Sequence, residues 1–311
     1  MMIAISLALL LNTACLPSVE ASADSCQISG KFQKIVFKFL GRELALTQSS
    51  FGLSIFDKRT GDLVCEDYVE PEQNTYPASS IKTLIAIAVL RLVDQGQIGL
   101  HSQIEIRQPN AAAECIDWDC HVYGPGHFVT VRQMLTDMLT VSNNLAANQL
   151  MDLATRPFIN DTAVALQANT LRIYHKVYNI QDPEPDNPLR NYATAAGMVQ
   201  MYREIATGRL RLLSASSMGI LIDDLAHEHY HDSLNADFPA NVVFYHKPGE
   251  TSSSTSDGGY LDIGNNRVAV IVGLQNFHDY NYCSSSCGEK TGLFSLKMIG
   301  RATLDLIRSI H

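Results

Sequence analysis

Ser79 and Lys82 are the first pair of residues whose types and spacing could support covalent chemistry. They form the only Ser-x-x-Lys in the chain and share one face of a helix, since they lie three residues apart. A serine hydroxyl becomes a good nucleophile when a neighbouring group takes its proton, and a lysine can do so where desolvation or nearby positive charge lowers its pKa. The alternative is that Ser79 caps a helix while Lys82 points into water.

The residues around Ser79 favour the catalytic interpretation. Pro77 precedes the pair, as a proline does in the first turn of a helix. Residues 79–93 are apolar on nearly every side, which is typical of a buried helix. Lys82 would then be desolvated, and the anion that develops would lie near the positive end of the helix.

Ser142–Asn144 and Lys247–Gly249 are two further polar segments with candidate roles. Taken singly, each has an ordinary explanation. The first lies between two apolar helical stretches and would cap the second of them. The second follows an apolar strand and would make a turn. The order in which all three segments occur makes chance a poor explanation.

Together, the three segments resemble those of the class A β-lactamases and their penicillin-binding relatives. Residues 76–82 (YPASSIK) are similar to the family's nucleophile motif, residues 140–148 (TVSNNLAAN) to its Ser-Asp-Asn segment, and residues 246–249 (HKPG) to its Lys-Thr-Gly strand. The resemblance implies an exported serine hydrolase that acts through an acyl-enzyme on β-lactams or related amides. Two alternatives keep the same site: a D-alanyl-D-alanine peptidase, amidase or esterase, and a penicillin-binding sensor that does not turn over.

The resemblance implies a role for each reactive side chain. Ser79 would attack the carbonyl, and Lys82 would accept its proton. Ser142, held by Lys82 and Lys247, would pass a proton to the departing nitrogen. Lys247 would also supply positive charge for the carboxylate of the substrate.

The same resemblance implies the groups that hold the substrate. Asn144 would bind its amide side chain. The backbone N–H groups of Ser79 and Glu250 would form the oxyanion hole, where each donor contributes about 3–4 kcal/mol. The substrate would also lie against Gly249, and Thr251 or Ser252 would supply the hydroxyl that the family usually places next to its lysine.

The chain departs from the family pattern at several positions. Asn143 stands where the family has aspartate, and Pro248 where it has a hydroxyl residue. The glutamate that activates the deacylating water in class A enzymes is expected near Tyr178, which is not an acid. Glu184, in a proline-rich loop with Asp182 and Asp186, is the weak candidate that remains.

Two other segments have both a functional and an ordinary interpretation. Trp118 lies between the first two motifs and would either border the substrate cleft or anchor its own loop. The run 227–232 (HEHYHD) has the composition of a metal site, but alternating histidines in an irregular segment are more typical of a surface. We therefore expect neither a metal nor a cofactor.

The hydrophobic pattern predicts an α+β fold. Apolar periodicity and turn residues give the order helix, two strands, helical block, three strands, helix, which indicates an antiparallel sheet flanked by the N- and C-terminal helices, with an inserted all-α lobe. Helices are expected at residues 27–45, 79–93, 131–139, 144–153, 193–205, 214–225 and 293–310, and strands at residues 51–56, 63–67, 242–246, 259–263 and 267–274.

The N-terminus predicts export. Residues 3–11 are almost all apolar, and the small residues 21–23 are typical of a cleavage site, so residues 1–23 are interpreted as a signal peptide and 24–311 as one catalytic domain. The product would be periplasmic or secreted. Lipidation at Cys15 is the less favoured alternative, because Asn12 stands where an aliphatic residue is usual.

Composition and cysteines agree with an exported enzyme. Six cysteines follow residue 23, an even number that indicates disulfides, with Cys115–Cys120 and Cys283–Cys287 as local pairs and Cys26 and Cys65 left over. A metal site made from these cysteines is the alternative. The charge of −9 comes without a basic cluster, so nucleic-acid binding is not expected. We also expect the protein to be a monomer without a membrane span that acts on a small-molecule substrate.

Overall fold

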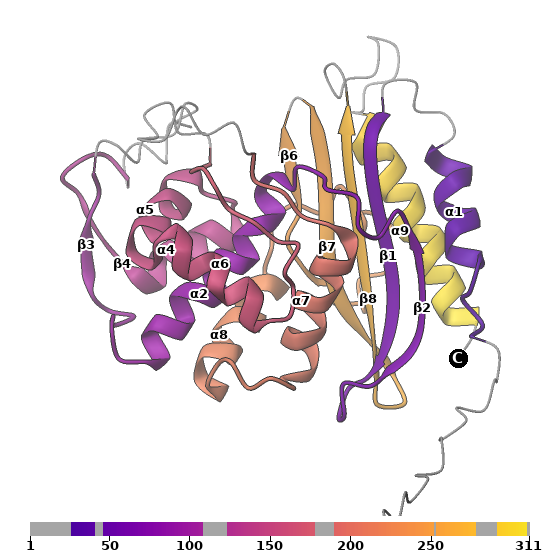
Figure 1. The fold of residues 1–311 in the computed structure, drawn as a ribbon, viewed down its shortest axis with the longest axis horizontal. Helices are drawn as coiled ribbons and strands as arrows, with labels where there is room; N and C mark the ends of the chain where they lie inside the picture. The colour runs from indigo at the N-terminus through magenta and orange to yellow at the C-terminus, as the bar shows by residue number, and fades with distance from the viewer. Residues whose placement is uncertain are drawn as a thin grey trace, which may run out of the picture.

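The computed structural model describes residues 26–40, 46–107, 123–177, 190–251, 253–277 and 291–309. Its centre is an antiparallel sheet with strand order β2-β1-β8-β7-β5, and β6 also pairs with β7. The strands are β1 (Leu46–Asp57), β2 (Leu63–Val69), β5 (Tyr245–His246), β6 (Gly249–Thr251), β7 (Ser254–Gly264) and β8 (Arg267–Phe277). Figure 1 shows this sheet between two groups of helices.

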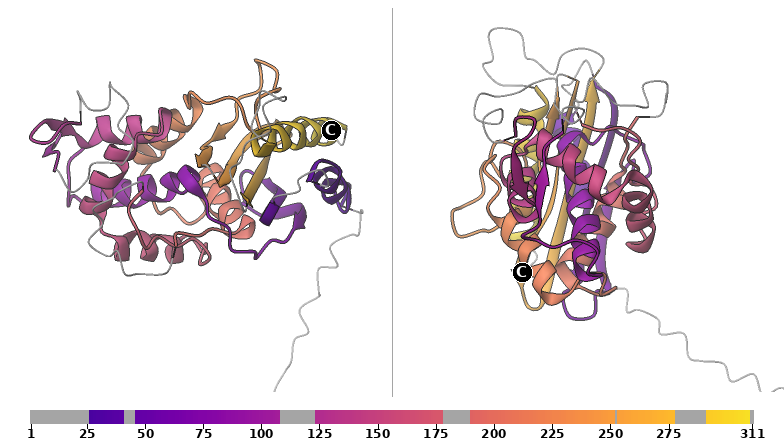
Figure 2. Two further views of the ribbon diagram at one scale, coloured as in Figure 1. Left: turned by 90° about the horizontal axis from the view of Figure 1, so that it is seen from above. Right: turned by 90° about the vertical axis from the view of Figure 1, so that its left-hand side faces the viewer.

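Alternating side chains of the sheet enter two separate cores. Val268, Val270 and Val272 pack toward the helical lobe, whereas Ala269 and Ile271 pack toward the terminal helices. The terminal helices α1 (Lys31–Leu40) and α9 (Thr291–Ser309) cover that second face together, while α7 (Ala195–Thr207) covers the first. Figure 2 shows α1 and α9 on one side of the strands and the other helices on the opposite side.

The helical lobe is built around α2, which is apolar on almost every side and is surrounded by other helices. Its members are α2 (Lys82–Asp94), α4 (Val131–Thr140), α5 (Asn144–Ala154), α6 (Arg156–Ala165) and α8 (Ala215–Ala226), with the short hairpin β3 (Gln103–Glu105) and β4 (Phe128–Thr130) at its outer edge. A helix with no polar face is stable only when it is buried. The lobe therefore fixes both ends of α2, including the end that carries Ser79.

Polar residues determine where four of these helices begin. The side chains of Thr130, Asn143, Thr194 and Ser214 each accept a hydrogen bond from the backbone N–H three residues later. Such caps satisfy donors that the first helical turn leaves unpaired, and each contributes about 1 kcal/mol. The expected starts of α4, α5, α7 and α8 are therefore close to the observed ones.

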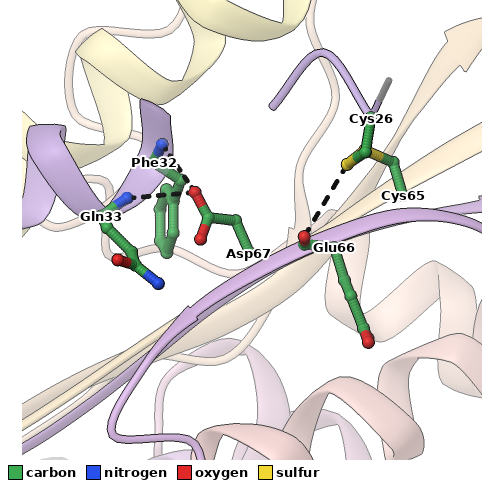
Figure 3. Close-up of a disulfide and its surroundings, with 6 residues drawn as sticks. All are labelled: Cys26, Phe32, Gln33, Cys65, Glu66 and Asp67. Carbon is green, nitrogen blue, oxygen red and sulfur yellow. Dashed lines mark hydrogen bonds between the residues drawn. A yellow bond between two sulfur atoms is a disulfide. The ribbon is translucent and has the colours of Figure 1, made fainter. Parts of the chain in front are cut away.

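The N-terminal helix is fixed to the sheet by a disulfide and by a carboxylate. Cys26 and Cys65 are joined, with their Cα atoms 5.4 Å apart, which confirms the third of the expected pairs. Two residues further along β2, Asp67 accepts hydrogen bonds from the backbone N–H groups of Phe32 and Gln33 at 3.0 and 3.3 Å (Figure 3). The carboxylate thus lies at the positive end of α1.

The expected α+β class is confirmed, but several boundaries were wrong. The strand expected at residues 259–263 begins at Ser254, because the Ser/Thr-rich run before it lies buried in β7 with bonded hydroxyls. The strand expected at residues 242–246 is limited to Tyr245–His246. Helix α6, the β3–β4 hairpin and β6 were not expected. In the described part of the chain, no helix is long and apolar enough to cross a membrane.

Candidate active site

Ser79 lies on a 3₁₀ turn, η1 (Ala78–Ile81), that leads directly into α2. A hydrogen bond ties this turn to the sheet: the hydroxyl of Ser256 on β7 donates to the carbonyl of Pro77 at 2.6 Å. Ala78 has a left-handed backbone, with φ of 47°. Such strain persists where surrounding contacts enforce it and is frequent at functional sites. Ser79 is partly exposed, and its hydroxyl has no hydrogen-bond partner among the described residues.

Lys82, one turn further along, is fully buried rather than directed into water. Its Nζ donates to the backbone carbonyl of Ser142 at 2.6 Å, to the hydroxyl of the same residue at 3.1 Å and to the side-chain oxygen of Asn144 at 2.6 Å. The alternative of a solvated lysine is therefore wrong. The apolar surface of α2 desolvates the amine, as the sequence predicted, and the loop between α4 and α5 supplies its polar neighbours.

The Ser142–Asn144 loop serves both as a cap and as part of the site. Asn143 is the helix cap: its Oδ1 accepts from the N–H of Ala146 at 2.7 Å. Ser142 has a left-handed backbone, with φ of 57°. Because Asn143 turns inward to cap α5, the side chains on either side of it reach Lys82. The expected cap is confirmed for Asn143, and the catalytic roles of Ser142 and Asn144 stay a prediction.

Gly249 brings strand β6 against the nucleophile turn. A Cβ atom at this position would lie 2.5 Å from the backbone nitrogen of Ser79 and 2.6 Å from that of Ser80. Only a residue without a side chain permits this approach. Glu250 is the next residue on β6, and the role of its N–H group in an oxyanion hole stays a prediction.

Lys247 contacts an acid that the sequence did not indicate. Its Nζ lies 2.6 Å from the carboxylate of Glu228, and both side chains are fully buried. Burial lowers the pKa of Lys247, and the charge of Glu228 opposes that shift. The other carboxylate oxygen accepts from the N–H of Tyr230 at 3.2 Å, and the Tyr230 ring lies 5.9 Å from the ammonium. The expected contact between Lys247 and Ser142 is not present.

A second buried polar network fixes the residue that precedes Lys247. Nδ1 of His246 lies 2.9 Å from Asp257, and the hydroxyl of Ser233 donates to the same carboxylate. Asn235 contacts the other ring nitrogen of His246 at 3.0 Å. This network fixes His246 at the end of β5, and Lys247 follows directly with its side chain paired to Glu228.

The comparisons with known proteins agree with this geometry. The model of the β-lactamase enzyme family matches residues 39–288, which is most of the chain. The protein belongs to that family. Within the β-lactamase family, it is a class A-like serine hydrolase.

Individual relatives are distant in sequence and similar in fold. β-Lactamase VEB-1 of Pseudomonas aeruginosa is 23% identical over 245 residues, which cover 73% of this chain and 78% of that protein. The β-lactamase of Sphaerobacter thermophilus shares the fold with a TM-score of 0.72 at 20% identity, covering 90% of this chain and 98% of that one. A PBP-A variant solved as an acyl-enzyme complex with penicillin G has a TM-score of 0.70 at 22% identity, covering 88% and 97%.

Several of the expected site residues lie outside the described part of the β-lactamase-family structure. These residues are Trp118, Tyr178, Asp182, Glu184, Asp186 and Ser252. The expected signal peptide (residues 1–23, with Cys15) and the expected pairs Cys115–Cys120 and Cys283–Cys287 also lie outside it. Thr251 is described, and its hydroxyl pairs with that of Ser254 at 2.7 Å. Among the described residues, no group of three or more His, Cys, Asp or Glu side chains could hold a metal ion.

Asn191 holds together the two described ends of the segment that contains Glu184. Its side-chain oxygen accepts from the N–H groups of Tyr174 and His175 at 2.7 and 2.9 Å, and its nitrogen donates to the carbonyl of His175 at 3.0 Å.

Glu228 is the main residue of the site that the sequence analysis missed. The run 227–232 was interpreted as surface, and its three histidines are indeed exposed. Glu228 between them is buried. Lys247 follows an apolar strand, so its buried ammonium needs an acid as a partner. Nothing in the local sequence identifies which acid that is.

Proposed function

We propose that the protein forms an acyl-enzyme at Ser79 with β-lactams or related amides and hydrolyses it slowly. The observation that carries this proposal is the contact of the buried Lys82 amine with Ser142, one helical turn from Ser79. A desolvated amine one turn from the nucleophile and in contact with a second hydroxyl is placed to pass a proton from Ser79 to Ser142. The nearby N–H groups of the nucleophile turn and β6 would face the developing oxyanion.

In the acylation step, Ser79, Lys82 and Ser142 would act one after another. The hydroxyl oxygen of Ser79 bonds to the carbonyl carbon as its proton passes to Lys82. The carbon–nitrogen bond then breaks, and Ser142 gives its proton to the departing nitrogen while Lys82 restores the proton to Ser142. Asn144 would hold the amide of the substrate, because its oxygen is bonded to Lys82 and its nitrogen has no partner among the described residues.

Intact-mass measurement tests the acylated residue. After incubation with a penicillin, the protein should gain the mass of one molecule, and peptide mapping should place it on the peptide that contains Ser79. Ser79→Ala should show no adduct. An adduct that persists in Ser79→Ala, or that maps to another peptide, contradicts the assignment.

Slow turnover is proposed from the missing glutamate near Tyr178. A positioned general base contributes about 10²–10⁴-fold, so its absence leaves a long-lived acyl-enzyme. We expect the adduct to persist for minutes after excess penicillin is removed. Rapid turnover that Glu184→Gln abolishes, with accumulation of adduct, would show instead that Glu184 supplies the base.

The alternatives are separated by the same measurements. A D-alanyl-D-alanine peptidase, amidase or esterase would turn over its own amide or ester substrate faster than it releases a penicilloyl adduct, so turnover of an acyl-D-alanyl-D-alanine peptide is measured beside penicillin. A sensor would give one stoichiometric burst and nothing further. The left-handed backbones of Ala78 and Ser142 and the polar contacts of Lys82 are common to all three alternatives, so only the measured turnover separates them.

Export with removal of residues 1–23 is also proposed. The Cys26–Cys65 disulfide supports it, because disulfides persist mainly in oxidising compartments. The N-terminal sequence of the protein recovered from cells tests it: a start at Asp24 agrees with the proposal, whereas an intact Met1 contradicts it and a start at Cys15 indicates a lipoprotein.

A further inference from the structure

Lys247, to which the resemblance assigns the carboxylate of the substrate, is paired with an acid in the interior of the protein. The ammonium of Lys247 and the carboxylate of Glu228 are 2.6 Å apart, and neither side chain is exposed to solvent. Glu228 is held in place by the backbone of Tyr230, through a hydrogen bond of 3.2 Å to its other oxygen. The pair is therefore a fixed part of the structure rather than a surface contact.

This pairing removes the charge that Lys247 would otherwise offer to a ligand. If the lysine keeps its proton, the ammonium and the carboxylate sum to zero. If burial transfers the proton to Glu228, an amine and a carboxylic acid also sum to zero. In both arrangements the pair has no net charge, so it attracts an anion more weakly than an unpaired buried ammonium does.

The strands next to Lys247 add no second positive charge. The segment from Gly249 to Gly264, which forms β6 and β7, contains no lysine or arginine, and it includes the acid Glu250. Pro248, next to Lys247, has neither a hydroxyl nor an N–H to donate. The surface over Lys247 is instead the ring of Tyr230, which is 45% exposed. The immediate surroundings of Lys247 consequently carry no net positive charge and are partly aromatic.

We propose that the site prefers acyl donors whose leaving group carries no carboxylate, and that Glu228 sets this preference. The inference rests on the proposed acylation of Ser79 and names the class of substrate that this reaction takes: an uncharged amide or ester. Glu228 acts by neutralising and positioning Lys247 and does not touch the reacting atoms. A carboxylate-bearing β-lactam would still acylate the enzyme, but without the contribution that an unpaired lysine makes.

Benzylpenicillin and its methyl ester test this preference, because they differ only in the carboxylate. We expect the wild-type enzyme to be acylated by the ester at least as fast as by the acid, measured by the growth of the adduct on Ser79. In Glu228→Gln, the unpaired Lys247 ammonium should raise the ratio of acid to ester reactivity by about 10–100-fold, the value of one charge-assisted hydrogen bond.

Asp223→Asn is the matched control. It removes the same single negative charge close by in the chain, but Asp223 is on α8 with a side chain that is 63% exposed. Its ratio should equal that of the wild type. If it changes as much as in Glu228→Gln, the effect is a general one of net charge, and the inference is wrong.

A double variant protects the test against misfolding of Glu228→Gln, in which a buried lysine loses its partner. Lys247→Met with Glu228→Leu leaves no charge, so the ratio of acid to ester should stay at the wild-type value. A fall in that ratio would mean that Lys247 does attract the carboxylate in the wild type, which overturns the inference. So would a wild-type enzyme that reacts much faster with the acid. Absence of any adduct on Ser79 from both compounds instead overturns the proposed acylation, and this inference with it.

Discussion

The Nζ atom of Lys82 lies 3.1 Å from the hydroxyl oxygen of Ser142, although 60 residues separate the two in the chain. The contact joins the start of α2 to the loop between α4 and α5. It connects the residue beside the nucleophile with a hydroxyl that can carry a proton. The chemistry of the site therefore depends on how three helices of the α lobe pack together.

Lys82→Met should abolish acylation while the protein stays folded. The thioether fills the apolar part of the lysine site but cannot accept a proton, so we expect the rate of adduct formation on Ser79 to fall by about 10²–10⁴-fold. Stopped-flow or quenched intact-mass measurements give this rate. Lys58→Met is the control, since Lys58 makes an exposed ion pair with Asp262 far from the site in the fold. Labelling at the wild-type rate in Lys82→Met would assign the base to another residue.

Gly249→Ala should damage the site more than the fold. The added Cβ would meet the backbone nitrogens of Ser79 and Ser80 and push β6 away from the nucleophile turn. Since loss of one oxyanion donor costs about 10²–10³-fold, we expect at least that reduction in acylation rate. Gly219→Ala is the control: it lies in α8 with open space around it and should stabilise the protein by about 0.5–1 kcal/mol. Equal acylation rates for both variants would place the oxyanion donors elsewhere.

Loss of the Cys26–Cys65 disulfide should destabilise the protein without affecting the site. The bond closes a loop of 39 residues, for which chain entropy predicts a loss of up to about 4 kcal/mol in the free energy of unfolding. Urea unfolding of Cys26→Ala with Cys65→Ala measures it, and acylation of Ser79 should be retained. Thiol titration of the denatured, unreduced protein tests the four other cysteines after residue 23. Free thiols there would contradict the proposed Cys115–Cys120 and Cys283–Cys287 pairs.

Alkaline pH should destabilise the fold through its buried tyrosines. Burial raises the pKa of Tyr68 to about 12 and also raises that of Tyr260. The folded state therefore keeps the Tyr68 proton while the unfolded chain, with a pKa near 10, releases it. The resulting stabilisation is complete below pH 10 and is lost as the pH rises through 12, a change of about 3 kcal/mol.

Tyr68→Phe should reduce this dependence on pH. Urea unfolding at several pH values between 8 and 12 should show a flatter decline for the variant than for the wild type. The variant also loses the 2.9 Å hydrogen bond between Tyr68 and Ser54, which lowers its stability at pH 8 by about 1 kcal/mol. Parallel curves for the two proteins would show that Tyr68 ionises equally in both states.

The sequence alone determined the features that arise from local pattern and motif order. An unbroken apolar run predicted the buried helix α2, apolar periodicity predicted α4, α7 and α8, and a cap within Ser142–Asn144 predicted where α5 begins. The order of the Ser79, Ser142 and Lys247 segments predicted the family, and the hydrophobic pattern predicted the α+β fold. Caps and periodicity involve residues only a few positions apart, and for that reason they can be recognised without knowing the packing.

Only the tertiary structure decided which polar groups meet. The run 227–232 gives no sign that Glu228 is buried while the histidines on either side are exposed, because that depends on where Lys247 arrives from another strand. The Ser/Thr-rich start of β7 has the composition of a turn, yet it is buried because Ser256 can bond to Pro77, 179 residues earlier. A buried polar group is stable only with a partner, and here each partner comes from a distant element, so its identity follows from packing and not from local sequence.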